Sequence, residues 1–215
     1  MIITAIERQK RRQRVNVYGE GGRFAFALAL HLAQDAALHT GMELTDAQAD
    51  ALQEADARHS AYDAALRLLS YRPRSEKEMR RRLGRRGIDL RLIAETVARL
   101  KERGYLDDEA FARFWTETRE ATSPRGRRLL LQELRTQGVN ADTAAAATAS
   151  VSDEDAAYRA AGRRLHTLRG LDYEDFRRRL GGFLVRRGFP YDVARRTTER
   201  CWREAGGSEG EMTQP

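Results

Sequence analysis

The chain has 215 residues, of which 41% are hydrophobic, 33% charged and 7% aromatic. This length suits one or two ordinary domains or a row of modules with small cores. The formal net charge of +7 favours a nucleic acid or an acidic protein surface as the partner.

Two broad classes of protein are excluded by simple features of the chain. Cys201 is the only cysteine, so neither a disulfide framework nor a cysteine-based zinc site can form within one chain. The first residues lack the apolar segment of a secretory signal. The apolar run over 24–33 is too short to span a bilayer. We therefore expect a soluble, cytoplasmic protein with no membrane contact.

Residues 1–28 show the period of β-strands. Val15 and Val17 alternate with polar neighbours, and apolar residues alternate again over 24–28 after a turn signal at 20–23. This pattern predicts a hairpin or three short strands.

Two helices are expected next. Residues 30–38 predict a short helix that ends near Gly41. Thr45 and Gln48 form a capping box for a helix that we expect to end near Arg58.

The stretch from 72 to 112 carries the clearest helix signals. Ser75 and Glu78 form an S-x-x-E capping box. Met79 and Leu83 then lie four residues apart on one face, and Gly87 is a natural stop. A second helix is expected between Asp89 as its cap and Gly104, followed by a third that Asp107 and Asp108 open. The apolar positions of these last two helices are Leu92, Ile93, Val97, Leu100, Phe111, Phe114 and Trp115.

A leucine four residues before a glycine recurs with a period of about 50 residues, which is typical of an array of repeated units. The pairs are Leu83 with Gly87, Leu134 with Gly138, and Leu184 with Gly188. Each period has room for three helices. We expect Ser123 and Pro124 to start the middle helix of the second period, and Ser152 and Asp172 to cap helices of the third.

The predicted fold is mainly α, with tandem three-helix modules in an elongated array after a small β-hairpin or strand region. The expected divisions are an N-terminal region at 1–58, modules at 59–106, 107–151 and 152–205, and a disordered tail at 206–215.

The motif stretch resembles the RecX family, bacterial regulators of the RecA recombinase. The resemblance is specific here and becomes loose after about residue 150, and the first 58 residues resemble an extension of some longer relatives. It rests on the patterns R-x-R-S-E-x-E, L-x-x-x-G and GYLDD-x-x-FA, which are matched by Arg72, Arg74, Ser75, Glu76, Glu78, Leu83, Gly87, Gly104, Tyr105, Leu106, Asp107, Asp108, Phe111 and Ala112.

The resemblance implies tandem three-helix modules that lie in the groove of the RecA–DNA filament. It also implies inhibition of the ATPase, strand exchange and co-protease activities of RecA, within homologous recombination, DNA repair and the SOS response.

No catalytic pattern is found in the chain. His31, His39, His59 and His166 share no metal-binding spacing, and there is no phosphate-binding glycine loop. We therefore expect no enzyme activity, no metal and no cofactor. Tyr105 and Leu106 are expected to pack in a joint between modules, and Cys201 is expected to be half-buried and inert.

Arginines cluster at one place in each module, around its second helix. The recurrence predicts a basic stripe along one edge of the array, which would contact phosphates or an acidic groove of a protein filament. A solvated face balanced by nearby carboxylates is the alternative. The candidate partner- or DNA-binding residues are Arg72, Arg74, Arg81, Arg82, Arg85, Arg86, Arg125, Arg127, Arg128, Arg178, Arg186 and Arg187.

A second basic cluster, at Lys10, Arg11, Arg12 and Arg14, would join this stripe or protect a strand edge.

The leading hypothesis is a monomeric, non-enzymatic regulator of the RecA filament. The alternative is a protein that binds single- or double-stranded DNA directly, as helix-turn-helix modules do. The helices show no obvious base-reading face of Asn, Gln or Ser, which argues for phosphate contacts rather than sequence readout.

Overall fold

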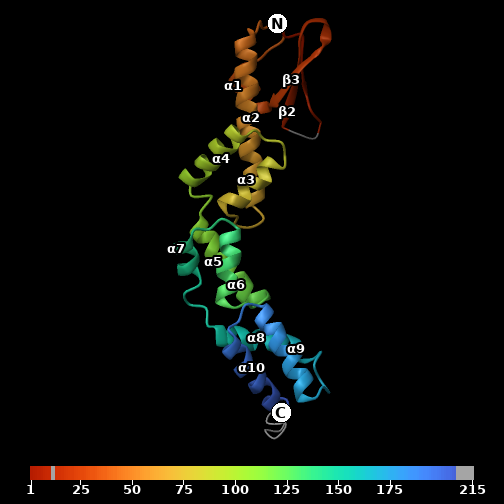
Figure 1. Cartoon of the computed structure of the whole chain (residues 1–215). Coiled ribbons are helices and arrows are strands. Elements are labelled where there is room, and N and C mark those ends of the chain that lie inside the picture. Colours follow the sequence, from red (N-terminus) through yellow and green to blue (C-terminus); the bar gives the residue numbers. More distant parts are fainter. Residues whose placement is uncertain (11–12, 207–215) are drawn as a thin grey trace. The chain divides into compact units, whose positions relative to one another are not determined.

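The computed structural model describes residues 1–10 and 13–206. The chain forms two compact units, which are treated separately below. The first comprises Met1–Arg72 and Met79–Tyr105, and the second comprises Pro73–Glu78 and the chain from Leu106 onwards. Figure 1 names the elements along the chain. Arg11, Arg12 and the tail from residue 207 lie outside the described residues.

The N-terminal sheet has three antiparallel strands in the order β1-β2-β3. They are β1 (Ala5–Arg8), β2 (Arg14–Tyr18) and β3 (Phe24–Ala29). Val15, Val17, Phe26 and Leu28 are buried, because alternate residues of a strand face the same side. Of the two predicted arrangements, the structure has the three strands, and these cover one small core.

Helix α1 (Leu30–Asp35) is followed by α2 (Asp46–Leu69), a single helix of 24 residues. The predicted capping box of Thr45 and Gln48 is present, but the prediction that this helix ends near Arg58 is wrong. The segment contains neither glycine nor proline, so nothing in its backbone interrupts the helix. The predicted boundary at 58/59 falls inside α2.

A partly buried ion pair holds the sheet to the middle of α2. The two terminal guanidinium nitrogens of Arg14, Nη1 and Nη2, donate to the Asp56 carboxylate at 3.0 and 2.6 Å, and the Ala29 N–H donates to the same group at 2.7 Å. The Arg14 side chain therefore stabilises the fold by joining the sheet to α2.

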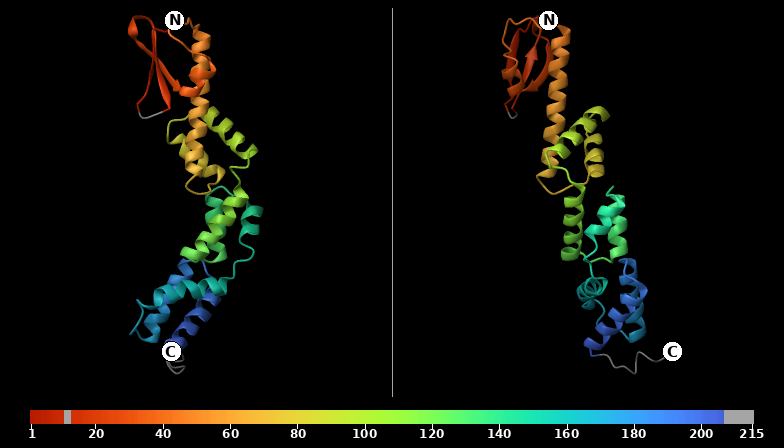
Figure 2. Two further views of the ribbon diagram at one scale, coloured as in Figure 1. Left: turned by 180° about the vertical axis from the view of Figure 1, so that it is seen from behind. Right: turned by 90° about the vertical axis from the view of Figure 1, so that its left-hand side faces the viewer.

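The later part of α2 and the remaining helices form the predicted groups of three. The first unit contains most of α3 (Glu76–Gly84) and all of α4 (Leu90–Glu102). The second contains α5 (Asp108–Thr122), α6 (Arg127–Thr136) and α7 (Ala141–Ala147), then α8 (Asp153–Leu165), α9 (Tyr173–Arg186) and α10 (Tyr191–Glu204). Two views of these elements are given in Figure 2.

The repeat marker has a clear structural meaning. Leu83, Leu134 and Leu184 are fully buried. The glycines four residues later have φ values of 75°, 93° and 85°, a left-handed conformation that ends each second helix. The recurring pair therefore closes the middle helix of every module and anchors it to the core.

Most predicted helix caps are confirmed. Asp89, Asp107, Ser152 and Asp172 each accept a backbone N–H of the helix that follows. Ser123 and Pro124 do not start α6, because the helix begins at Arg127 with Gly126 as its N-cap. None of the helices in the described part of the chain is long and apolar enough to cross a membrane.

Candidate functional site

The module that contains α5–α7 has a similar set of contacts at each of its two ends. Ser75, the N-cap of α3, donates its hydroxyl to the Gln137 carbonyl at 2.6 Å, and Asp108 accepts the Glu76 N–H at 2.9 Å. Gly138 lies so close that a Cβ atom there would be 2.5 Å from the Lys77 Cβ. We call these contacts the first joint.

The second joint repeats this arrangement about 50 residues later. The Gly126 N–H, at the N-cap of α6, donates to the Arg187 carbonyl at 2.9 Å, and Asp153 accepts the Arg127 N–H at 2.8 Å. A Cβ atom on Gly188 would lie 2.4 Å from the Leu129 Cβ. In both joints, an aspartate at the start of one helix caps a helix of the preceding module.

These joints correct two expectations for the GYLDD motif. Asp108 caps α3 rather than only opening α5, as its bond to Glu76 shows. Leu106 is buried, but Tyr105 is 56% exposed and is not a packing residue. Gly104, with a φ of 69°, ends the preceding helix as predicted.

The arginines of the RPRSE motif lie in different surroundings. Arg74 is buried, and its Nη1 atom lies 2.6 Å from the Glu78 carboxylate, which is also buried. Ser75 accepts the Glu78 N–H at 3.1 Å, as the capping box requires. Arg72 is half-buried. Arg74 therefore supports the start of α3 and is not available to a partner.

Exposed arginines lie on the outer side of α3 and in the turn that follows it. Met79 and Leu83 are fully buried, which fixes the inner face of this short helix. Arg81, Arg82, Arg85 and Arg86 are exposed. At 100° per residue, Arg81 and Arg85 lie opposite the buried pair. The first unit therefore presents a compact set of outward guanidinium groups.

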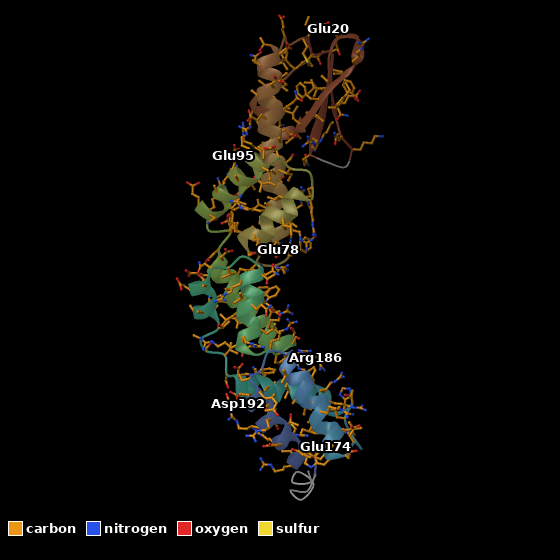
Figure 3. The ribbon with its side chains drawn as sticks, viewed as in Figure 1. Glu20, Glu78, Glu95, Glu174, Arg186 and Asp192 are labelled. Carbon is orange, nitrogen blue, oxygen red and sulfur yellow. The ribbon has the colours of Figure 1, made fainter. Side chains whose placement is uncertain are left out.

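In the second unit, the second joint brings together arginines of the last two modules. The bond between Gly126 and Arg187 places the exposed Arg127 and Arg128, at the start of α6, near the exposed Arg186 at the end of α9; Figure 3 labels Arg186. Cations at a helix N-terminus oppose the helix dipole. Arg127 and Arg128 therefore do not stabilise α6 through the helix dipole, and their presence at this position needs another explanation.

Other predicted site residues have partners within the protein. Arg178 lies 2.6 Å from Asp175. Arg187 donates to Ser123 Oγ at 2.8 Å. Arg125 lies against the Glu133 carboxylate. Arg187 and Arg125 are only partly exposed, and Arg187 links the end of α9 to the turn before α6.

The exposed arginines differ in how far they are neutralised. Over residues 1–10 and 13–206, no ion pair is formed by Arg81, Arg85, Arg86, Arg127, Arg128 or Arg186. In contrast, Arg177, Arg178 and Arg179 of α9 all lie within 4 Å of Glu174 or Asp175. The unpaired arginines are thus the residues best suited to an external anionic partner.

Comparisons with known proteins identify all three modules. Family models of the first, second and third RecX three-helix domains match residues 61–100, 107–147 and 152–197. The model of the regulatory protein RecX N-terminal domain matches residues 1–45. Together these models cover most of the chain, including the sheet.

Relatives and solved structures agree with this assignment. The regulatory protein RecX of Bacillus subtilis (strain 168) is 32% identical over 89% of this chain and 74% of its own length. That of Streptomyces coelicolor is 35% identical over 66% of this chain and 77% of its own. A crystal structure of regulatory protein RecX has the same fold, with a TM-score of 0.61 at 23% identity over 98% of this chain and 96% of that one. The chain therefore belongs to the RecX family of non-enzymatic regulatory proteins.

Proposed function

We propose that this protein regulates RecA by binding the RecA–DNA filament through its unpaired, exposed arginines, and that binding inhibits the ATPase, strand-exchange and co-protease activities. Family membership makes it a regulator of RecA. The observation that supports this mode of binding is a set of outward guanidinium groups that pair with no carboxylate among residues 1–10 and 13–206, at Arg81, Arg85, Arg86, Arg127, Arg128 and Arg186.

The arrangement of the arginines suits a partner built from repeated subunits, such as a filament. They occur in both compact units, so one chain has separate basic surfaces that can touch successive protomers of a filament. Weak contacts that are linked in one chain add through effective concentration. A guanidinium also forms paired hydrogen bonds with a carboxylate or a phosphate. Binding would therefore depend on several modules rather than on one.

The second candidate is direct binding to DNA. The exposed Arg127 and Arg128 at the start of α6 favour it, because guanidinium groups there suit a phosphate backbone. Such binding to bare DNA would weaken steeply with added salt. Binding that needs RecA would distinguish the filament from the nucleic acid as the target.

The test is charge reversal at the unpaired arginines of α3 and of the turn that follows it. We expect the combined variant Arg81→Glu, Arg85→Glu and Arg86→Glu to bind RecA–DNA filaments at least about tenfold more weakly than the wild type, since each lost charged contact costs roughly 1.5–3 kcal/mol. Filament affinity is measured by cosedimentation, and helicity by circular dichroism.

The control carries the same change in charge on α9. Arg177→Glu, Arg178→Glu and Arg179→Glu replace arginines that are paired within the protein. We expect a smaller loss of affinity for this variant. An α3 variant that is helical and binds filaments as tightly as the wild type would remove the first unit from the proposed surface.

A further inference from the structure

Four guanidinium groups surround the turn between α5 and α6. Two belong to the module that contains this turn: Arg119 near the end of α5 and Arg125 in the turn itself. The others reach it from the next module. Arg163 of α8 donates to the Ala121 carbonyl at 2.6 Å, and Arg187 after α9 donates to Pro124 O at 3.4 Å. We call these four residues the joint arginines.

The joint arginines have one carboxylate among them. Glu133 of α6 accepts from Arg119 Nε at 3.0 Å and from Trp115 Nε1 at 2.9 Å, and Arg125 lies against the same group. Within the described part of the chain, Arg163 and Arg187 pair with no carboxylate and instead donate to neutral oxygens. Four positive charges thus face one negative charge.

The excess charge lies in a partly desolvated place. The side chains of Arg119 and Arg125 are each 27% exposed. Burial lowers the pKa of Arg125, and the neighbouring Arg119 and Arg187 lower it further. The pKa of Arg187 is lowered in the same way, first by burial and then by Arg163, Arg119 and Arg164. Mutual repulsion of this kind is relieved by a bound anion.

We propose that Arg119, Arg125, Arg163 and Arg187 form a binding site for one phosphate group at the second joint. A tetrahedral phosphate offers several oxygens to guanidinium donors that approach from different helices. The group would be a phosphodiester of a nucleic-acid backbone or a free phosphate ion. Because the donors belong to two modules, the bound group also ties the second and third modules together.

This site does not depend on the proposed contact with RecA. Its residues differ from the exposed, unpaired arginines named for the filament, and its ligand is tested without RecA. The alternative is that the four side chains only hold the two modules together. In that case phosphate would have no specific effect on the protein.

The experiment is isothermal titration of the full chain with inorganic phosphate, at constant ionic strength set with sodium chloride. We expect saturable binding by the wild type. Arg163→Gln should weaken it by about tenfold or more, since a lost hydrogen bond between charged groups is worth roughly 1.5–3 kcal/mol. Arg177→Gln, on the exposed face of α9 and beside Glu174, is the matched control and should bind as the wild type does.

A second variant covers the case in which Arg163→Gln loses helicity by circular dichroism. Arg163→Lys keeps the charge but loses the planar fork, and we expect it to fold and to bind phosphate with intermediate affinity. An absence of saturable binding by the wild type would overturn the proposal. So would equal affinities of the wild type and a folded Arg163 variant.

The source of the phosphate is settled by competition. A single-stranded oligodeoxynucleotide that displaces inorganic phosphate would identify the nucleic-acid backbone as the ligand. Phosphate binding that persists under saturating oligodeoxynucleotide would identify a free phosphate ion.

Discussion

Arg72 and Arg74 stand two residues apart in the motif but have different surroundings. Arg74 is 8% exposed and pairs with Glu78, which is 3% exposed. Removing one partner of such a pair leaves a buried charge without compensation. The motif therefore contributes a buried ion pair that stabilises the fold, in addition to surface charge.

This pair leads to a prediction about stability. Glu78→Ala should lower the free energy of unfolding by about 3–5 kcal/mol, because the buried Arg74 guanidinium would lose the carboxylate that lies 2.6 Å from it. Urea denaturation followed by circular dichroism measures this change. Glu117→Ala, at an exposed position of α5, is the control and should change stability by less than about 0.5 kcal/mol. Equal urea midpoints for the two variants would contradict the structural role of Glu78.

Cys201 is fully buried rather than half-buried as expected, and it belongs to the core of the third module. Burial raises the pKa of its thiol to about 11. The thiolate is the reactive form of cysteine. The expectation that this residue is inert therefore has a physical basis in the packing of α10.

The thiol makes a pH-dependent contribution to stability. Between the ordinary pKa of 9.0 and about 11, the unfolded chain loses the thiol proton while the folded chain keeps it. Fewer bound protons in the unfolded state mean that stability falls as pH rises through this range. We expect Cys201→Ser to show a shallower loss of stability over this range in urea denaturation. Identical slopes for the variant and the wild type would contradict the shifted pKa.

At the scale of the elements, the second joint depends on glycine. A Cβ atom on Gly126 would lie 2.2 Å from the Gly188 carbonyl oxygen, which is closer than real Cβ atoms approach. This close contact also explains why the N-cap of α6 is a glycine and not a residue whose side chain could cap the helix.

The prediction is that Gly126→Ala destabilises the protein by about 1–3 kcal/mol, as overpacking does. Gly162→Ala is the matched control, since Gly162 lies inside α8 with open space around its Cβ position. That substitution should stabilise the protein by about 0.5–1 kcal/mol, because alanine favours a helix interior. Thermal unfolding of the two variants gives the comparison, and shifts in the same direction would contradict the close contact.

Local patterns predicted the elements that depend on local contacts. The caps at Asp89, Asp107, Ser152 and Asp172 each bind a backbone group within three residues. The bonds from Asp108 to Glu76 and from Asp153 to Arg127 span 32 and 26 residues, and no local pattern contains them. The continuity of α2 was missed because its capping box and the repeat that begins near Ala61 suggested two separate helices.

At the scale of the whole molecule, composition and spacing predicted arginine clusters around the second helices. Composition and spacing could not show that Arg74, Arg125 and Arg187 make contacts within the protein. Such contacts depend on side-chain burial. Those of Arg187 also depend on residues more than 60 positions away. Arg119 and Arg163 were missed for the same reason. The Arg163 side chain contacts carbonyls 41 and 42 residues earlier in the chain.

The family assignment and the modular fold lead to one account of the whole molecule. Each module supplies a small core, and its second helix or a neighbouring turn supplies guanidinium groups. The joints fix the capped ends of these helices. The proposed mode of action is therefore many modest contacts along a repetitive partner.

The most direct test of this account is the RecA ATPase on single-stranded DNA, measured with preformed filaments and substoichiometric amounts of this protein. We expect turnover to fall sharply, with fewer than one copy per RecA protomer being sufficient. The variant with Arg81→Glu, Arg85→Glu and Arg86→Glu should inhibit more weakly. Unchanged turnover, together with binding of this protein to bare DNA, would contradict the filament as its target and favour direct action on nucleic acid.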